Sequence, residues 1–368
     1  MSSRVQPAPP TFEISTAIHP PAHYNKPAGE RYGMEYVRFG TTGLVVSRIC
    51  LGLMSYSNLE KPWFDWMLDE SRSLPFIKQA LDAGINFFDT AEVYSNGKSE
   101  EFFGRALQQL LPASQFTRED LVIATKILPA RSLSGDGFHY GIQKGLSRKA
   151  IFAAVEGSLE RLQTSYIDLY ILHRYDPNTS PEETVNALHD LITAGKIRYV
   201  GASAMFLWQF HRLVTAGEKI GLRFVSMQNH YNALYREEER EIIPFCVDHG
   251  ITLTPYSPLA SGLLTRRPGS EASAREKSDP VQRGKYYKTG DDEVIAAVRQ
   301  VADKRAVPPA QVALAWVLGK QGVSAPIIGA TKPHHIEDAV KALKLKLTEE
   351  EITAIESQYL PHAISGFS

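Results

Sequence analysis

Four side chains that could together move a proton stand at the ends of three successive apolar runs. The run 85–88 leads into Asp89 with Tyr94 five residues later, and the next two runs end in Lys126 and His173. A phenol with a pKa of about 10 donates a proton poorly unless its anion is stabilised, and a buried ammonium within about 4–6 Å lowers that pKa. We expect Lys126 to act in this way and Asp89 to keep Lys126 protonated. We expect His173 to hydrogen-bond a carbonyl oxygen and orient it.

Taken one at a time, these residue types have ordinary explanations. An Asp at a strand end is usually a turn or cap residue, a Lys there is usually solvated, and a His usually belongs to the core or the rim. Four such residues at consecutive strand ends favour a site, because the carboxyl ends of barrel strands meet on one face.

Apolar, strand-like runs alternate with amphipathic segments of helical period along most of the chain. The strand-like runs cover residues 49–53, 85–88, 121–125, 167–172, 197–201, 224–227, 251–254 and 326–328. The helical segments cover residues 71–83, 99–110, 147–163, 180–194, 205–218, 237–249, 291–306 and 333–343, with an appended helix at 347–359. Eight strand–helix units predict an α/β fold of the (β/α)8 TIM barrel type. A doubly wound sheet is the main alternative, but the GxGxxG string that it needs after an early strand is absent.

The ends of the chain differ from this repeating part. Residues 34–39 and 44–47 flank a Gly-Thr-Thr-Gly turn and predict an N-terminal β-hairpin. Residues 1–33 contain six of the 22 prolines, which predicts an extended arm. We therefore divide the chain into a Pro-rich N-terminal extension (1–33), a barrel (34–361) and a C-terminal tail (362–368).

The composition argues against several classes of partner. Net charge is −1, with 40 Lys and Arg against 41 Asp and Glu, so neither a nucleic acid nor a membrane is expected as a partner. No apolar run approaches the roughly 18 residues of a transmembrane helix. Cys50 and Cys246 form no CxxC spacing, and the N-terminus lacks a signal-peptide core, which predicts a reducing, cytoplasmic location. The pair His334 and His335 lacks further ligands, so no metal site is expected.

Several stretches resemble known motifs of one enzyme family. Residues 84–94 (Gly-Ile-Asn-Phe-Phe-Asp-Thr-Ala-Glu-Val-Tyr) and 99–104 (Ser-Glu-Glu-Phe-Phe-Gly) look like the N-terminal motif of the aldo-keto reductases. Residues 162–173 and 195–203 are similar to the central motifs of that family. Residues 228–240 resemble its microbial and fungal aryl-alcohol-dehydrogenase-like branch, which includes versiconal hemiacetal acetate reductase-type enzymes. The resemblance covers roughly residues 35–361.

This resemblance implies a (β/α)8 barrel that uses NADPH to reduce an aldehyde or ketone to an alcohol, with an aryl or natural-product-type compound as substrate. Asp89, Tyr94, Lys126 and His173 fall on the catalytic tetrad of the family. Tyr94 would be the proton donor, Lys126 and Asp89 would adjust its acidity, and His173 would orient the carbonyl group.

The resemblance also implies that the dinucleotide lies extended across the barrel mouth. Ser203, Gln228 and Asn229 would hold its carboxamide, and Tyr256 would hold its nicotinamide ring. The pyrophosphate would be bound by Ser257, Leu259 and Gly262. The adenine end would be bound by Gly329, Thr331, Lys332 and His335. The last group opens a helix, whose free N–H groups can bind an anion.

Three positions depart from the pattern of many relatives. Ala204 stands where an Asn is common, His335 where an Arg or Gln is common, and Ala339 where another Asn is common. The preference for NADPH over NADH therefore stays open.

The substrate loops are predicted from composition alone. Trp63 and Trp66 belong to an aromatic insert that could wall an apolar pocket, with packing below the barrel or at an interface as the alternative. Residues 265–287 are polar and suit a mobile lid over the cofactor, with a disordered loop as the alternative.

Two other functions remain open at this stage. One is a non-catalytic NADP(H)-binding regulatory subunit, and the other is a Schiff-base aldolase with Lys126 as nucleophile. The physiological substrate, the reaction direction and the oligomeric state are also open.

Overall fold

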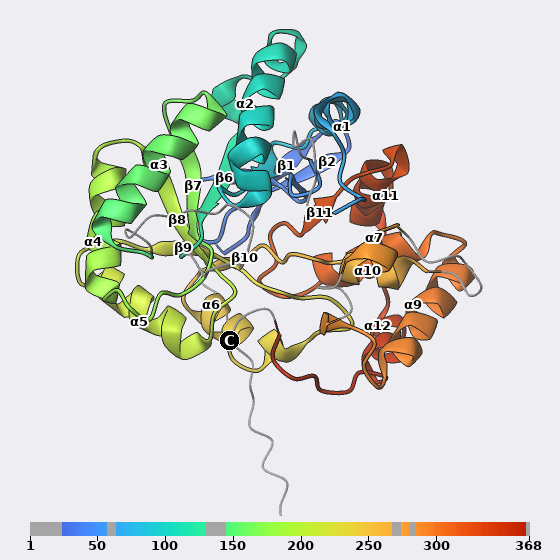
Figure 1. The fold of residues 1–368 in the computed structure, drawn as a ribbon. Coiled ribbons are helices and arrows are strands. Elements are labelled where there is room, and N and C mark those ends of the chain that lie inside the picture. The colour runs from blue at the N-terminus through green and yellow to red at the C-terminus, as the bar shows by residue number, and fades with distance from the viewer. Residues whose placement is uncertain (1–23, 57–63, 130–144, 267–273, 280–283, 366–368) are drawn as a thin grey trace, which may run out of the picture.

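The computed structural model describes residues 24–56, 64–129, 145–266, 274–279 and 284–365. Eight parallel strands curl around a common axis with helices outside them (Figure 1). In spatial order these strands are β10 (Thr252–Leu253), β9 (Phe224–Gln228), β8 (Ile197–Ser203), β7 (Ile167–Leu172), β6 (Val122–Ile127), β5 (Phe87–Asp89), β4 (Cys50–Gly52) and β11 (Ile327–Gly329). Parallel bridges from Leu253 to Val323 and from Tyr256 to Ile327 join the two edges of the sheet. The predicted (β/α)8 barrel is thereby confirmed.

The helices follow the predicted segments closely. They are α1 (Glu70–Asp82), α2 (Lys98–Leu110), α3 (Arg148–Leu162), α4 (Pro181–Thr193), α5 (Leu207–Glu218), α6 (Ile242–Asp248), α7 (Ala274–Ser278), α9 (Asp291–Arg305), α10 (Pro309–Leu318), α11 (Pro333–Lys344) and the appended α12 (Glu349–Glu356). Short 3-10 helices are η1 (Tyr94–Gly97), η2 (Leu111–Ala113), η3 (Arg118–Asp120), η4 (Glu237–Glu239) and η5 (Ala260–Thr265). Within the described residues, no helix is both long and apolar enough to cross a membrane.

Local capping chemistry sets many of these boundaries. The hydroxyl of Ser147 accepts a hydrogen bond from the Ala150 N–H at the start of α3, and Ser180 does the same for Glu183 at the start of α4. Such bonds satisfy N–H groups that the first helical turn leaves without partners. Gly195 follows α4 with a φ of 71°, a left-handed conformation that glycine adopts without steric cost.

Three helical segments differ from the prediction. The segment predicted at 237–249 is divided into η4 and α6, α10 lies in a stretch to which no helix was assigned, and α7 lies within residues 265–287, which were predicted to be a polar lid or a disordered loop. Nearly every residue of α10 is buried, and the helix packs against α9 and α11. A helix that is apolar on almost every side shows no clear amphipathic period, so the pattern that identified the other helices is missing there.

Side chains along the barrel strands alternate between the interior and the helix layer. In β6, Val122 and Ala124 belong to the apolar cluster inside the barrel, whereas Ile123 and Ile127 pack in the cluster that includes the helices. The same alternation turns Lys126 toward the barrel interior. Asp89 follows from the same rule, because Phe87 in β5 lies in the interior cluster.

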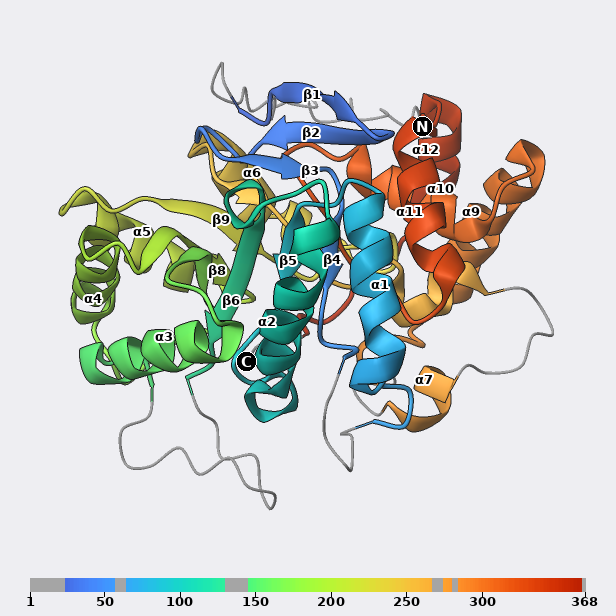
Figure 2. The ribbon, with the colours of Figure 1, turned by 90° about the horizontal axis from the view of Figure 1, so that it is seen from above.

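A three-stranded antiparallel sheet closes one end of the barrel. It comprises β1 (Pro27–Arg31), β2 (Met34–Arg38) and β3 (Val45–Ser47), and Figure 2 shows it at one end of the barrel with α7 at the other. Val37, Phe39 and Val46 join the interior cluster, and the Tyr36 hydroxyl donates to the Gly84 carbonyl oxygen at 2.7 Å, just before β5. The three-stranded sheet therefore covers the amino ends of the barrel strands.

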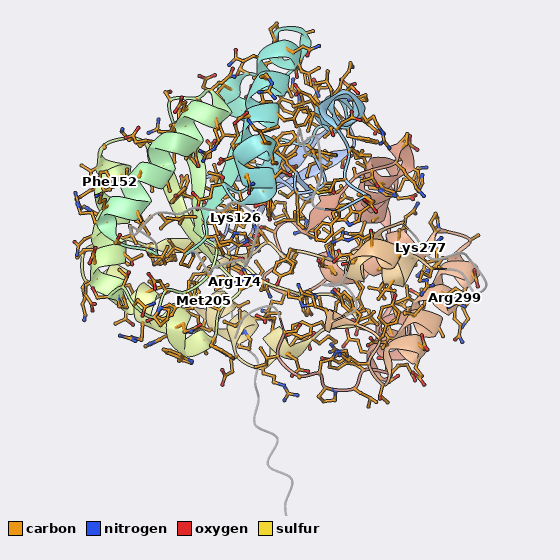
Figure 3. The ribbon with its side chains drawn as sticks, in the orientation of Figure 1. Lys126, Phe152, Arg174, Met205, Lys277 and Arg299 are labelled. Atoms are coloured by element: carbon orange, nitrogen blue, oxygen red, sulfur yellow. The ribbon has the colours of Figure 1, made fainter. Side chains whose placement is uncertain are left out.

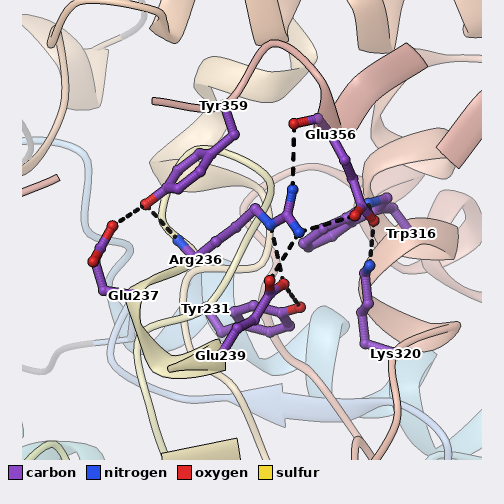
Figure 4. Close-up of polar contacts among 8 residues, drawn as sticks. All are labelled: Tyr231, Arg236, Glu237, Glu239, Trp316, Lys320, Glu356 and Tyr359. Carbon is purple, nitrogen blue, oxygen red and sulfur yellow. Dashed lines mark hydrogen bonds and ion pairs between the residues drawn. The ribbon is translucent and has the colours of Figure 1, made fainter. Parts of the chain in front are cut away.

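An ionic network attaches the C-terminal helix to the barrel (Figure 4). The Arg236 guanidinium contacts the carboxylates of Glu239 at 2.8 Å and Glu356 at 2.9 Å. Glu356 also accepts hydrogen bonds from the Trp316 indole at 3.0 Å and from Lys320. Because Glu239 lies in η4, Glu356 in α12 and Trp316 in α10, these contacts join three elements that are distant in the chain.

A further hydrogen bond extends this attachment past α12. The Tyr359 hydroxyl donates to the Glu237 carboxylate at 2.6 Å and accepts from the Arg236 N–H at 3.1 Å. Arg236 and Glu237, which belong to the stretch 228–240 that resembled the aryl-alcohol-dehydrogenase-like branch, therefore bind the C-terminal segment.

Gly104 provides a test of the close packing between α2 and α3. A Cβ at this position would lie 2.7 Å from the Arg161 carbonyl oxygen and 2.8 Å from that of Leu162, both of which are backbone atoms. We expect Gly104→Ala to lower the free energy of unfolding by about 1–3 kcal/mol, as overpacking does elsewhere. Gly43→Ala is the control, because a Cβ there meets no atom within 4 Å. Urea denaturation should show a change below about 0.5 kcal/mol for the control, and equal effects of the two substitutions would contradict the packing argument.

Candidate active site

The Lys126 ammonium is the centre of a polar cluster at the carboxyl ends of the strands. Lys126 has 0% exposure, and its Nζ donates to Asp89 Oδ1 at 2.6 Å, to the Thr90 carbonyl oxygen at 2.7 Å and to the Tyr94 hydroxyl at 3.2 Å. An ammonium carries three N–H donors, so all three are satisfied. The structure thus brings together three of the four residues that the strand ends predicted.

The backbone after β5 holds Tyr94 over this ammonium. The Tyr94 N–H donates to the Ala91 carbonyl oxygen at 3.0 Å, and the next three residues have left-handed φ values of 50° (Ser95), 55° (Asn96) and 83° (Gly97). Non-glycine residues in this region are uncommon and often mark functional sites. The turn sends the chain directly into α2.

A buried ion pair fixes α2 behind that turn. Glu100 is fully buried, accepts a hydrogen bond from the Thr125 hydroxyl at 2.5 Å and pairs with the Arg161 Nε at 2.6 Å. Thr125 precedes Lys126 in β6, and Arg161 lies in α3. This pair was not predicted, although Glu100 lies in the motif 99–104 that carried the family resemblance.

His173 completes the cluster from the end of β7. Its ring lies nearly perpendicular to the Tyr94 ring, with centroids 6.1 Å apart and an interplanar angle of 83°. Its N–H backbone group donates to the Ile127 carbonyl oxygen at 2.9 Å, which extends the pairing of β6 and β7. The His173 Nδ1 is buried and has no hydrogen-bond partner among the described residues.

Burial and charge set the protonation states of these groups. Burial lowers the pKa of Lys126, but Asp89 and Tyr94 outweigh that effect and the net pKa is raised. Burial raises the pKa of Tyr94 more than Lys126 lowers it, so the net pKa is raised, although Lys126 acts in the direction that the sequence predicted. Burial, with the positive charges of Arg174 and Lys126, lowers the pKa of His173 well below its usual value. Near neutral pH the site therefore contains an ammonium, a phenol and a neutral imidazole.

Gln228 makes a contact that the sequence did not predict. This residue ends β9, and its Nε2 donates to Asp89 Oδ2 at 2.8 Å, so it orients the carboxylate that pairs with Lys126. Its neighbours at the barrel mouth are the buried Ser203 and Asn229, which the sequence also assigned to the cofactor carboxamide. Ala204 has a φ of 38°, a conformation that Asn tolerates better than Ala.

The Tyr256 ring belongs to a stack of aromatic rings. The His230 ring lies 5.3 Å from Tyr256 at an interplanar angle of 8° and 4.3 Å from Tyr235 at 17°. The Tyr286 hydroxyl lies 2.7 Å from His230 Nε2 and orients this imidazole. Tyr256 is therefore held rigidly as a flat surface, and the role of His230 in this was not predicted.

The segment after Tyr256 has an unusual backbone. Ser257, Ala260, Ser261 and Gly262 have φ values of 55°, 49°, 56° and 99°. Turns with left-handed residues point backbone N–H groups toward one side and favour anions there. Ser257, Leu259 and Gly262 are thus compatible with the predicted contact to a pyrophosphate.

The residues that were expected to bind the adenine end of the cofactor lie at the start of α11. The Thr331 N–H donates to His335 Nδ1 at 3.2 Å, and Lys332 is the N-cap residue and is exposed. Burial, helped by His334 and Lys332, lowers the pKa of His335 to about 4. Near neutral pH, His335 offers only a neutral imidazole, so a positive charge at this position comes from Lys332. Gly329, at the end of β11, is exposed beside this group.

The aromatic insert lies only partly within the described residues. Trp63 lies outside them, and Trp66 stacks on Phe64 with centroids 5.6 Å apart. The Arg275 guanidinium of α7 covers the Trp66 ring at 4.5 Å. Trp66 is therefore at the same end of the barrel as Tyr94.

In the described ranges, no three His, Cys, Asp or Glu side chains form a group that could hold a metal ion.

The chain is similar in sequence to several known proteins. The family model described as Aldo/keto reductase family matches residues 48–359. A protein from Metarhizium robertsii named aldo-keto reductase dtxS3 is 42% identical over 355 residues, which are 91% of this chain and 94% of that protein. The versiconal hemiacetal acetate reductase of Aspergillus parasiticus is 41% identical, over 90% of this chain and 98% of that protein. A Schizosaccharomyces pombe protein whose name describes an aryl-alcohol dehydrogenase is 43% identical, over 90% and 97% respectively.

The pairing of Lys126 with Asp89 can be tested by stability measurements. We expect Lys126→Met to lower the free energy of unfolding by about 3 kcal/mol, because it leaves a buried carboxylate without its cation. Adding Asp89→Asn should restore at least about 1 kcal/mol, since the uncompensated charge is then removed. Urea denaturation at pH 7 measures both values, and a double variant less stable than Lys126→Met would contradict the buried pair.

Proposed function

The chain belongs to the aldo/keto reductase family, and we propose that it reduces an aldehyde or ketone to an alcohol with NADPH. The observation that carries this proposal is the triple contact of the buried Lys126 ammonium with Asp89, Thr90 and Tyr94. It supports Tyr94 as a proton donor whose anion has a cation beside it.

The proposed roles follow from the protonation states. Tyr94 transfers its hydroxyl proton to the carbonyl oxygen, and the phenolate that forms is stabilised by Lys126 across 3.2 Å. Asp89 keeps Lys126 charged, and Gln228 holds Asp89 in place. The neutral His173 donates an N–H to the same carbonyl oxygen and orients it.

The cofactor site is proposed on the residues that remain. When bound, NADPH supplies the hydride. The Tyr256 ring, held by His230, gives the nicotinamide a flat surface. Ser203 and Asn229 would hold the carboxamide, and the left-handed turn at 257–262 would hold the pyrophosphate. Lys332, the N-cap residue of α11, supplies a positive charge that supports recognition of an adenosine phosphate and therefore of NADPH rather than NADH.

We also propose a class of substrate and a cellular location for the protein. The names of the relatives support an aryl or natural-product-type carbonyl compound, and Trp66 supplies an aromatic wall for it. The two cysteines are buried and unpaired, which supports a reducing compartment such as the cytoplasm.

The structure disfavours a Schiff-base aldolase. A lysine nucleophile must be a neutral amine, whereas the pKa of Lys126 is raised by Asp89 and Tyr94. A purely regulatory cofactor-binding role would leave the assembled Tyr94–Lys126–Asp89 contacts without a use.

Replacing the proton donor tests the proposed function directly. We expect Tyr94→Phe to lower kcat/KM for benzaldehyde by at least about 100-fold, the usual size of a general-acid contribution. Titration by protein fluorescence should give NADPH affinity within about threefold of the unmodified protein, because the phenol is not in the cofactor set. The control is Tyr166→Phe, which removes a hydroxyl just before β7, at the opposite end of the strands. A Tyr94→Phe protein that keeps most of its turnover would overturn the assignment.

The pH dependence of reduction follows from the same charges. The raised pKa of Tyr94 keeps the phenol protonated throughout the range from pH 6 to 9. The lowered pKa of His173 keeps the imidazole neutral there. We therefore expect kcat/KM for reduction to vary by less than about threefold over this range, measured at saturating NADPH. Oxidation of the alcohol needs the phenolate and should instead rise steadily with pH. A tenfold loss of reduction between pH 6 and 8 would contradict these protonation states.

A further inference from the structure

Two basic side chains at the barrel mouth have no use in the mechanism above. Arg174 follows His173 at the end of β7, and its Nη1 donates to the His173 carbonyl oxygen at 2.6 Å. Lys285 follows α7 in the chain, and its Nζ lies 5.1 Å from the centre of the Tyr256 ring. Figure 3 shows Arg174 near the middle of the ring of helices, in the region of Lys126.

Within the part of the chain that the structure describes, neither side chain forms an ion pair with a carboxylate. A third basic residue nearby, Arg275, pairs with Asp279 at 3.1 Å and covers the Trp66 ring, so it does not compete for a ligand. A partly buried cation without an ion-pair partner is costly, and its burial becomes favourable when an anion binds.

The local electrostatics agree with this geometry. Burial, followed by the charges of Arg174 and Arg275, lowers the pKa of Lys285 to about 8, and Asp279 acts in the opposite direction. Arg174 also lowers the pKa of His173 and acts in the lowering direction on Tyr94 and Tyr256. Arg174, bound to the His173 carbonyl oxygen, therefore acts electrostatically on the reacting groups, and it also acts on Lys285, which lies over Tyr256.

The position decides which ligand carries the anion. Arg174 lies beside His173, where the carbonyl group of the substrate is proposed to bind, and Lys285 lies over Tyr256. The pyrophosphate is proposed to lie against residues 257–262, and the adenine end of the cofactor is proposed to lie at the start of α11. An anion between Arg174 and Lys285 thus belongs to the substrate end of the site.

We propose that Arg174 and Lys285 bind an anionic group of the carbonyl substrate, so that the preferred substrates are aldehydes or ketones that carry a carboxylate. This proposal rests on the proposed function. Arg174 offers a planar pair of donors to the carboxylate, and Lys285 offers a compact charge. Neither residue takes part in the transfer of the proton or the hydride.

A matched pair of substrates tests the proposal. The measurement is the ratio of kcat/KM for 4-carboxybenzaldehyde to that for its neutral methyl ester, both with NADPH. We expect a ratio above about 10 for the unmodified protein, the usual effect of one charged hydrogen bond. Lys285→Gln should lower the ratio at least tenfold, and Lys285→Arg should retain most of it. Lys288→Gln, an exposed lysine three residues away, should leave the ratio unchanged.

A binding measurement separates this proposal from the reductase activity itself. Calorimetry on the full chain without cofactor should show that benzoate binds at least tenfold more tightly than benzamide, and Lys285→Gln should remove that preference. A protein that reduces neither aldehyde but prefers benzoate would refute the reductase and keep the anion site. Equal binding of benzoate and benzamide would overturn the anion site. An unchanged substrate ratio in Lys285→Gln together with weaker NADPH affinity would also overturn the anion site, because Lys285 would then hold the cofactor phosphates.

Discussion

A positive charge inside a β-barrel needs a negative partner, and this requirement organises the site. Lys126 is fully buried, so its ammonium is stable only with the Asp89 carboxylate at 2.6 Å. Pairing of β5 with β6 sets Asp89 opposite Ala124, two residues before Lys126 on the same face. A shift of one residue would turn one of the two charges into the helix layer. The register of these two strands and the charge pair therefore stabilise each other.

Burial destabilises the charged form of Lys126, and it also sets the protonation states of Tyr94 and His173. Removing water raises the pKa of a phenol and lowers that of an imidazole, so both groups stay neutral around pH 7. Each neutral form carries a hydrogen that it can donate. The Lys126 ammonium acts when the phenol loses its proton, because a charge at 3.2 Å then has an anion to stabilise. In the ligand-free site Tyr94 and His173 are thus both hydrogen-bond donors. Lys126 stabilises the Tyr94 phenolate only when it forms in the reaction.

The sequence predicted the fold almost completely, because strands and amphipathic helices leave a period in the chain. It missed α10, which is apolar on almost every side and has no clear period of this kind. It also placed Asp89, Tyr94 and Lys126 correctly together, because strand ends are visible as the limits of apolar runs. The contact of Gln228 with Asp89 could not be predicted, since it joins residues 139 positions apart whose side chains have several possible partners. Burial-dependent effects were the least accessible, as the raised pKa of Tyr94 and the lowered pKa of His335 illustrate.

The hydrogen bond from Gln228 to Asp89 also has an evolutionary meaning. Asp89, Tyr94, Lys126 and His173 all come from the first half of the barrel, whereas the proposed cofactor contacts begin with Ser203 in the second half. Gln228 belongs to the second half but orients a carboxylate of the first. Recombination between relatives in the loop after β7 would exchange the cofactor half and leave the proton donor in place. In such a chimera, the Asp89 carboxylate would keep its hydrogen bond from the second half of the barrel only if the incoming half brought an amide to position 228.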